Sequence, residues 1–132
     1  EYIFAEGCWR SLPDMPGTCN VHTNRGALVV WHDKVLVVGI RYTRVSRKVL
    51  EYAPVDRTWK DWPPLNTRME VCTALVFNSG LVVLGTIRGT PMHGTLVMEQ
   101  YNSDQRRWVV MGTYGGPGDW RNWDLVAGLI AL

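Results

Sequence analysis

Short apolar runs, separated by polar residues that favour turns, recur along most of the chain. The run Ala27–Trp31 is followed by a polar triplet and then by a second apolar run at residues 35–38. The same arrangement returns at residues 75–77 and 81–84. Runs this short, rich in Val and Leu and bounded by turn residues, are typical of β-strands rather than helices. Because apolar residues stand at successive positions, we expect these strands to be buried on both faces.

Two more strands are expected in each unit. In the first unit they are residues 49–52 and Thr58–Trp62, and the second of these alternates polar and apolar residues, as a strand nearer to solvent does. Turn residues predict hairpins at 33–34, 54–57, 79–80 and 103–105. Four antiparallel strands per unit, two central and two more polar, describe one blade of a β-propeller.

An aromatic pair repeats along the chain. Tyr and Trp stand seven residues apart in three places, at Tyr2 and Trp9, Tyr52 and Trp59, and Tyr101 and Trp108. The period is therefore about 50 residues, which indicates an array of like supersecondary units.

These features together resemble the kelch repeat. Each second apolar run ends in a glycine, Gly39 or Gly85, and the Tyr and Trp strands follow; Leu12, Pro13 and Met15 supply an exit after Trp9. The resemblance covers residues 1 to about 111 and lies nearest to BTB-kelch or F-box-kelch proteins. It implies an all-β fold of kelch-like propeller blades, each of four antiparallel strands. One departure is that a single glycine stands where the kelch repeat usually has a glycine doublet.

The repeat also predicts how the chain is divided. We expect the last two strands of a blade in residues 1–15, full kelch-like repeats in 16–65 and 66–111, and a connection followed by the first strand of another blade in 112–132. Propellers close with about four to eight blades. The ring is therefore expected to be incomplete, and the remaining blades, of the same propeller or of another chain, are expected partners.

Composition restricts the classes of function. The chain of 132 residues is 46% hydrophobic and 20% charged, with a net charge of +2. A nucleic-acid-binding domain would be much more basic, and no apolar run is long enough to span a membrane. The three cysteines, Cys8, Cys19 and Cys72, are odd in number and form no C-x-x-C pair. They favour a reducing compartment, the cytoplasm.

Catalytic chemistry has no visible motif. None of His22, His32 and His93 has a second ligand at metal spacing, and the carboxylates are scattered over loops and strand ends. The glycine-rich residues 112–118 lack the helix and Lys of a phosphate loop. We therefore expect no catalytic residue, no metal and no cofactor. The alternative is a propeller enzyme of the galactose-oxidase or sialidase-like type, and the ligand cluster of a copper oxidase is not visible.

Basic residues gather in one set of loops. In an up-and-down sheet the loop after the second strand and the loop between blades share one end, which collects residues 16–26, 40–48, 64–71, 86–95 and 111–124. These loops hold eight of the fourteen Lys and Arg residues and three of the twelve acids. The basic residues are Arg25, Arg41, Arg44, Arg47, Lys48, Arg68, Arg88 and Arg121.

This basic face predicts a protein-binding module. Arg pairs with carboxylates in a bidentate manner, and Arg with Tyr and Trp is the composition of interface hot spots. The residues expected to bind the partner are Arg41, Tyr42, Arg44, Arg88, Trp120 and Arg121. The expected ligand is an acidic or carboxylate-bearing protein segment. By the kelch resemblance, the module would serve as a ubiquitin-ligase substrate receptor or as a cytoskeletal adaptor.

Overall fold

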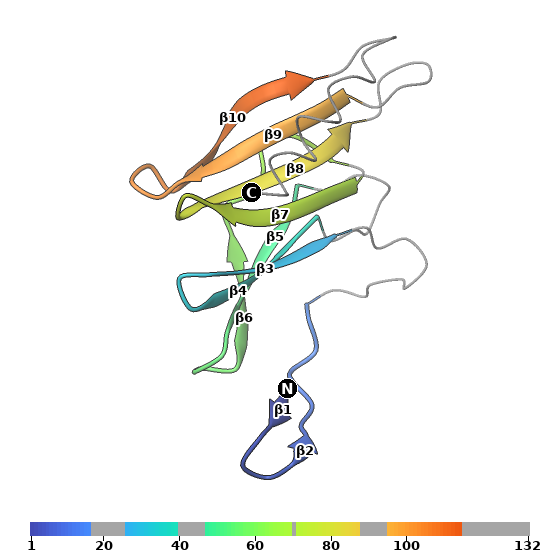
Figure 1. Ribbon diagram of the computed structural model, residues 1–132, viewed down its shortest axis with the longest axis vertical. Coiled ribbons are helices and arrows are strands. Elements are labelled where there is room, and N and C mark those ends of the chain that lie inside the picture. The colour runs from blue at the N-terminus through green and yellow to red at the C-terminus, as the bar shows by residue number, and fades with distance from the viewer. Residues whose placement is uncertain (17–25, 40–46, 70, 88–94, 115–132) are drawn as a thin grey trace.

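The computed structural model describes residues 1–16, 26–39, 47–69, 71–87 and 95–114, and these form ten strands and no helix. A two-stranded hairpin comes first, and two four-stranded sheets follow (Figure 1). The hairpin consists of β1 (Tyr2–Ile3) and β2 (Cys8–Trp9). The first blade consists of β3 (Ala27–Trp31), β4 (Lys34–Val38), β5 (Val49–Ala53) and β6 (Thr58–Trp62); the second consists of β7 (Val71–Phe77), β8 (Gly80–Ile87), β9 (Thr95–Asn102) and β10 (Arg107–Tyr114).

Each blade is a simple antiparallel meander. Every strand pairs with its neighbour in sequence, in the order β3-β4-β5-β6 and again from β7 to β10. The first hairpin of each blade turns through two residues with positive φ, His32 and Asp33 in one blade and Asn78 and Ser79 in the other. Two positive φ values suit the right-handed twist of the strands. The turns therefore lie one residue earlier than the predicted 33–34 and 79–80.

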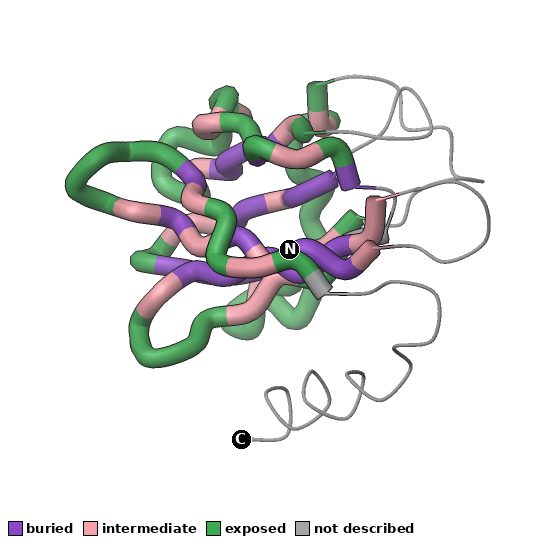
Figure 2. Tube along the Cα trace, turned by 90° about the horizontal axis from the view of Figure 1, so that it is seen from above, coloured by how far each residue is buried: buried purple, intermediate pink, exposed green. Residues whose placement is uncertain are grey.

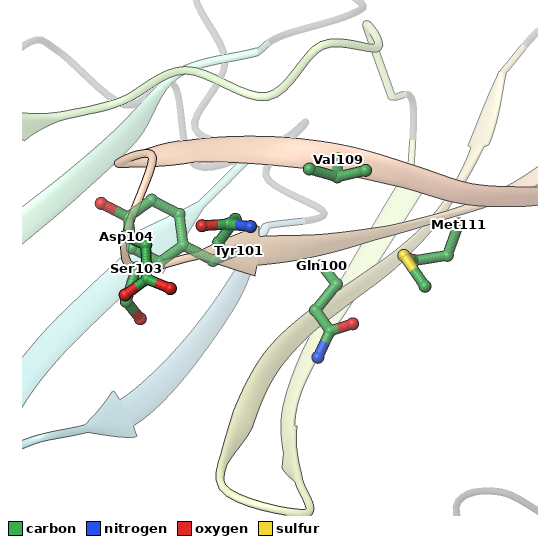
Figure 3. A pocket seen from close by; sticks show the side chains of 7 residues that line it. Gln100, Tyr101, Ser103, Asp104, Val109 and Met111 are labelled. Carbon is green, nitrogen blue, oxygen red and sulfur yellow. The ribbon is translucent and has the colours of Figure 1, made fainter.

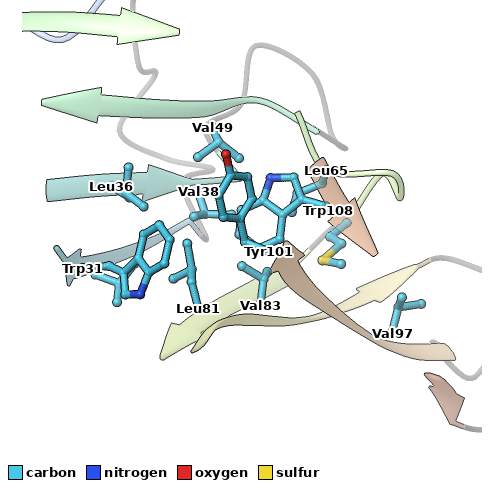
Figure 4. Close-up of a cluster of buried hydrophobic side chains, with 12 residues drawn as sticks. Trp31, Leu36, Val38, Val49, Leu65, Leu81, Val83, Val97, Tyr101 and Trp108 are labelled. Carbon is cyan, nitrogen blue, oxygen red and sulfur yellow. The ribbon is translucent and has the colours of Figure 1, made fainter. Parts of the chain in front are cut away.

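The hydrophobic core lies between the two blades. β3 lies beside β7, so the two sheets are stacked with their first strands together (Figure 1). Trp31 of β3 crosses the boundary, because its indole N–H donates to the carbonyl oxygen of Ser79 at 3.1 Å. The buried cluster draws on both blades and on the segment that links them (Figure 4): Val29, Trp31, Leu36, Val38, Val49, Leu65, Met69, Leu81, Val83, Val97, Tyr101 and Trp108.

Burial corrects the prediction that the first two strands of each blade are covered on both faces. β8 is buried at five successive residues, 81–85, as expected for a strand covered on both faces. β3 instead alternates, and Leu28 and Val30 are 64% and 60% exposed. One face of β3 packs against the second blade, and none of the described residues buries the other face. Figure 2 shows how buried, intermediate and exposed residues alternate along the chain.

The repeated aromatic pair has a constant structural place. In each case Tyr and Trp are direct partners across two adjacent antiparallel strands: Tyr2 with Trp9, Tyr52 with Trp59, and Tyr101 with Trp108. The ring centroids are 5.0–5.3 Å apart in the three pairs. Trp59 and Trp108 both lie on the fourth strand of their blades. This confirms that the sequence repeat is a structural repeat, and that the fold is all-β and built of four-stranded antiparallel blades.

Candidate functional site

The meander brings the entry and exit points of the longer loops to one edge of the blades. β4, β6, β8 and β10 end there, and β5, β7 and β9 begin there, whereas the tight turns lie at the opposite edge (Figure 1). Gly39, at the end of β4, has a φ of +75°, and its N–H donates to the carbonyl oxygen of Lys48 at 3.0 Å. We call this edge the loop face. The predicted grouping of loops agrees with this topology.

None of the six residues predicted to bind the partner lies in the part of the chain that the structure describes. Arg41, Tyr42, Arg44, Arg88, Trp120 and Arg121 all lie outside the described residues, as do Arg25, Cys19, His22 and His93. Residues 125–132, expected to form the first strand of another blade, lie outside them as well. The binding site itself therefore stays a prediction.

Three basic residues of the loop face are described. Arg47 and Arg68 are exposed, and Lys48 is half-buried. Lys48 forms an ion pair with Asp61 of β6, with Nζ and Oδ1 3.2 Å apart. The backbone beneath Arg47 is held, because its carbonyl oxygen accepts a hydrogen bond from the N–H of Leu65 at 2.9 Å. The link between blades thus packs against the loop that enters β5, and both bring cations to the same face.

A buried carboxylate fixes the link between the two blades. Glu99 of β9 has no exposed surface. Its Oε2 accepts from the backbone N–H of Asn66 at 2.9 Å and from the Asn66 Nδ2 at 3.3 Å, and its Oε1 accepts from the N–H of Thr67 at 2.7 Å. The Asn66 Nδ2 also donates to the carbonyl oxygen of Trp108 at 2.7 Å. Hydrogen bonds to a charged acceptor are stronger than those between neutral groups. The bonds to Glu99 therefore hold Asn66 and Thr67 of the link against the second blade.

Glu99 was not predicted as a functional residue. Each blade has one glutamate near its Tyr, Glu51 in the first blade and Glu99 in the second, and the sequence alone suggests that these two are equivalent. The strand pairing instead equates Leu50 with Glu99, because each lies two residues before the Tyr that faces the fourth-strand Trp. The available signal was a glutamate two residues before Tyr101, on the face of the strand that also carries Val97. A polar residue at a buried position indicates a specific structural or functional role, whereas a polar residue at an exposed position indicates none.

The indole of each fourth-strand Trp reaches the segment that precedes its blade. Trp108 donates to the carbonyl oxygen of Pro63 at 2.8 Å, and Trp59 donates to that of Pro13 at 2.9 Å. We call the boundary between residues 1–16 and the first blade the first seam. The boundary between the second blade and the first blade with its link, residues 63–69, is the second seam. The same Trp-to-Pro bond thus spans both seams.

The two seams differ in their polar contacts. Leu50, only 1% exposed, stands at the place of Glu99, and Pro16 stands at the place of Asn66 by the same offset that equates Pro13 with Pro63. Proline has no backbone N–H to donate. The first seam therefore lacks both the acceptor and one of its donors. In addition, the hydroxyl of Tyr52 is buried there with no hydrogen-bond partner among the described residues.

One depression lies away from the loop face. It sits at the hairpin that joins β9 and β10, which belongs to the opposite edge (Figure 3). Its lining is mostly polar: Gln100, Tyr101, Asn102, Ser103, Asp104, Val109 and Met111. Much of this polarity serves the turn itself, because the Asn102 Oδ1 accepts from the N–H of Gln105 at 2.8 Å.

Within the described ranges no group of three His, Cys, Asp or Glu residues could hold a metal ion. His32 lies exposed in its turn, and Cys8 is a free, exposed thiol. No helix suited to crossing a membrane occurs in the part of the chain that the structure describes.

Comparison with known proteins finds a similarity that agrees with the four-stranded antiparallel blades of the fold. No protein-family model matches the chain. The chain is similar to the Kelch repeat and BTB domain-containing protein 12 of Danio rerio, with 28% identity over 118 residues. The match covers 77% of this chain but 18% of the relative's length. The blades are therefore kelch-like in sequence as well as in strand arrangement.

Proposed function

We propose that the chain is part of a protein-interaction module, a kelch-like propeller that binds an acidic protein segment on the loop face. The observation that carries the proposal is the common edge at which the long loops enter and leave both blades. Loops on a rigid scaffold are where binding usually resides. Arg47, Lys48 and Arg68 bring positive charge to this edge.

The residues that we propose for binding divide into two roles. Arg41, Arg44, Arg88 and Arg121 would pair with carboxylates of the partner and steer its approach. Tyr42 and Trp120 would supply apolar contact at the centre, since aromatic residues dominate interface hot spots. The similarity to a kelch and BTB protein supports a partner that is a protein. A ubiquitin-ligase substrate receptor and a cytoskeletal adaptor are the two roles that suit such a module.

The test is a charge reversal on the loop face. Arg41→Glu combined with Arg44→Glu should weaken binding of a fluorescent Glu-rich peptide by about tenfold or more, because attraction becomes repulsion. Affinity is measured in the full chain by fluorescence anisotropy, at low and at physiological ionic strength, with a Gln-rich peptide as the uncharged control. Binding to the unaltered chain should weaken with salt.

A matched control lies at the opposite edge. Arg106→Glu combined with Arg107→Glu makes the same change of charge at exposed residues of the β9–β10 hairpin. This variant should bind the Glu-rich peptide almost normally. Equal losses in the two double variants would mean that net charge alone governs binding, and the loop face would lose its proposed role.

A further inference from the structure

The buried carboxylate of Glu99 also acts on the link between the two blades. A carboxylate with no exposed surface is costly to bury unless hydrogen bonds replace its water. Here its three hydrogen-bond donors among the described residues come from two successive residues, Asn66 and Thr67, of the link that crosses the loop face. The hydrogen bonds that offset the energetic cost of burying Glu99 therefore also hold this link in one conformation.

The residues on either side complete the anchoring. Leu65 and Met69 are 1% and 2% exposed, so both ends of the segment are packed into the core between the blades. Arg68 lies between them and is exposed. The segment thus has two apolar anchors, one polar anchor between them, and a single cation directed to solvent.

We infer that Glu99 is a positioning residue of the loop face, which fixes the place of Arg68 by holding Asn66 and Thr67. The inference rests on the proposed function, because it assigns Arg68 to the same binding surface. An arginine on a fixed backbone loses less conformational freedom on binding than one on a mobile loop. Glu99 would therefore raise affinity without touching the partner.

The first blade offers no equivalent. Leu50 accepts no hydrogen bond, and Pro16 has no N–H to donate where Asn66 has one. The paired absence of acceptor and donor indicates that the two residues at each seam form one unit. By this inference a carboxylate holds the second link, and among the described residues no carboxylate takes the same place at the first seam.

The experiment joins a partner-independent measurement with a binding measurement. Glu99→Gln retains one acceptor oxygen and replaces the other with an NH2 group that cannot accept. In the full chain, amide hydrogen exchange at Asn66 and Thr67 should become faster by about tenfold or more, as expected when a charge-assisted hydrogen bond is lost. Val97→Ala is the control, because Val97 is a buried residue on the same face of β9 and touches neither amide through a hydrogen bond.

Binding of the Glu-rich peptide is then compared in three backgrounds, the unaltered chain, Glu99→Gln and Val97→Ala, each with and without Arg68→Ala, which makes six proteins. Arg68→Ala alone should weaken binding by about three- to fivefold, typical of an exposed charge. In the Glu99→Gln background the same change should have little effect, because Arg68 is no longer held. In the Val97→Ala background it should keep its full effect.

The outcomes separate the inference from the proposed function. Faster exchange together with a diminished effect of Arg68→Ala supports the positioning role. Unchanged exchange, or an equal effect of Arg68→Ala in both backgrounds, overturns that role while leaving the binding face intact. If the unaltered chain binds no Glu-rich peptide, the proposed function fails and the role of Glu99 on that face fails with it.

Discussion

The first and second seams share the same hydrogen bond from a Trp indole, but they differ in the other polar contacts that accompany it. At both, a fourth-strand Trp donates to a proline carbonyl in the preceding segment, at nearly equal distances of 2.9 and 2.8 Å. At the second seam a buried glutamate adds three hydrogen bonds to the link, and at the first a leucine stands in its place. The aromatic contact is thus common to the repeat, and the carboxylate contact is specific to one seam.

Burial follows the same order. Trp108 at the second seam is 2% exposed, Trp59 at the first seam is half-buried, and Trp9 of the leading hairpin is 80% exposed. Each value reflects how much of a preceding segment covers the indole among the described residues. Equivalent positions in a repeat therefore make unequal contributions to stability, since each repeat is stabilised mainly by its neighbours.

The largest expected effect comes from removing the buried indole. Trp108→Ala should lower the free energy of unfolding by about 3–5 kcal/mol, the range for a buried large aromatic residue. Trp59→Ala should cost less, about 1–3 kcal/mol, because part of its surface stays in water. Trp9→Ala should change stability by no more than about 0.5 kcal/mol. Urea unfolding of the full chain, followed by circular dichroism, provides the three values, and equal costs for Trp59 and Trp108 would abolish the distinction between the seams.

The next largest effect is expected when the residue type found at the first seam, leucine, replaces the glutamate of the second seam. Glu99→Leu should destabilise the fold by about 2–4 kcal/mol, because the N–H groups of Asn66 and Thr67 lose their acceptor. The reference is Val97→Ala, which removes apolar contact from the same face of β9 without touching those donors. The mechanism is checked by amide exchange at Asn66 and Thr67, which only the first variant should accelerate. A leucine at position 99 that proved neutral would mean that apolar packing replaces the carboxylate without loss.

The reverse transfer requires two changes. Leu50→Glu alone should destabilise, since it buries a carboxylate opposite a proline that cannot donate. Pro16→Asn restores the donor that Asn66 supplies at the second seam. The double variant should therefore be more stable than the sum of the single effects by about 1–2 kcal/mol, measured as the interaction term of a double-mutant cycle. Additive effects would show that the alignment of Pro16 with Asn66 has no energetic meaning.

The sequence predicts the strands well because their signals are local. Runs of Val and Leu bounded by turn residues predict the first two strands of each blade, and the Tyr–Trp spacing identifies the third and fourth strands as partners. The turns are displaced by one residue, because several polar residues in succession, such as His32, Asp33 and Lys34, suit a turn equally and the twist of the strands selects the pair.

Features that depend on neighbouring layers are not predictable in this way. The apolar run of β3 indicates burial on both faces, yet Leu28 and Val30 are exposed, because burial depends on what packs against the strand. Glu99 escapes notice for the related reason that its donors lie more than thirty positions earlier in the chain. For the candidate site, topology confirms the common edge, whereas Arg41, Arg44, Arg88 and Arg121 stay predictions.

The smallest expected effect concerns an acidic residue of β6. Asp61 lies directly across from Leu50 on β6, is 80% exposed at its side chain, and pairs with Lys48. An exposed ion pair contributes little, so Asp61→Asn should change the free energy of unfolding by no more than about 0.5 kcal/mol. It removes one negative charge beside the loop face, however, and should strengthen binding of the Glu-rich peptide by about twofold at low ionic strength and less at high. A loss of stability comparable to that of Glu99→Leu would show that the first seam has a carboxylate anchor of its own, and the contrast between the seams would then be one of position rather than of strength.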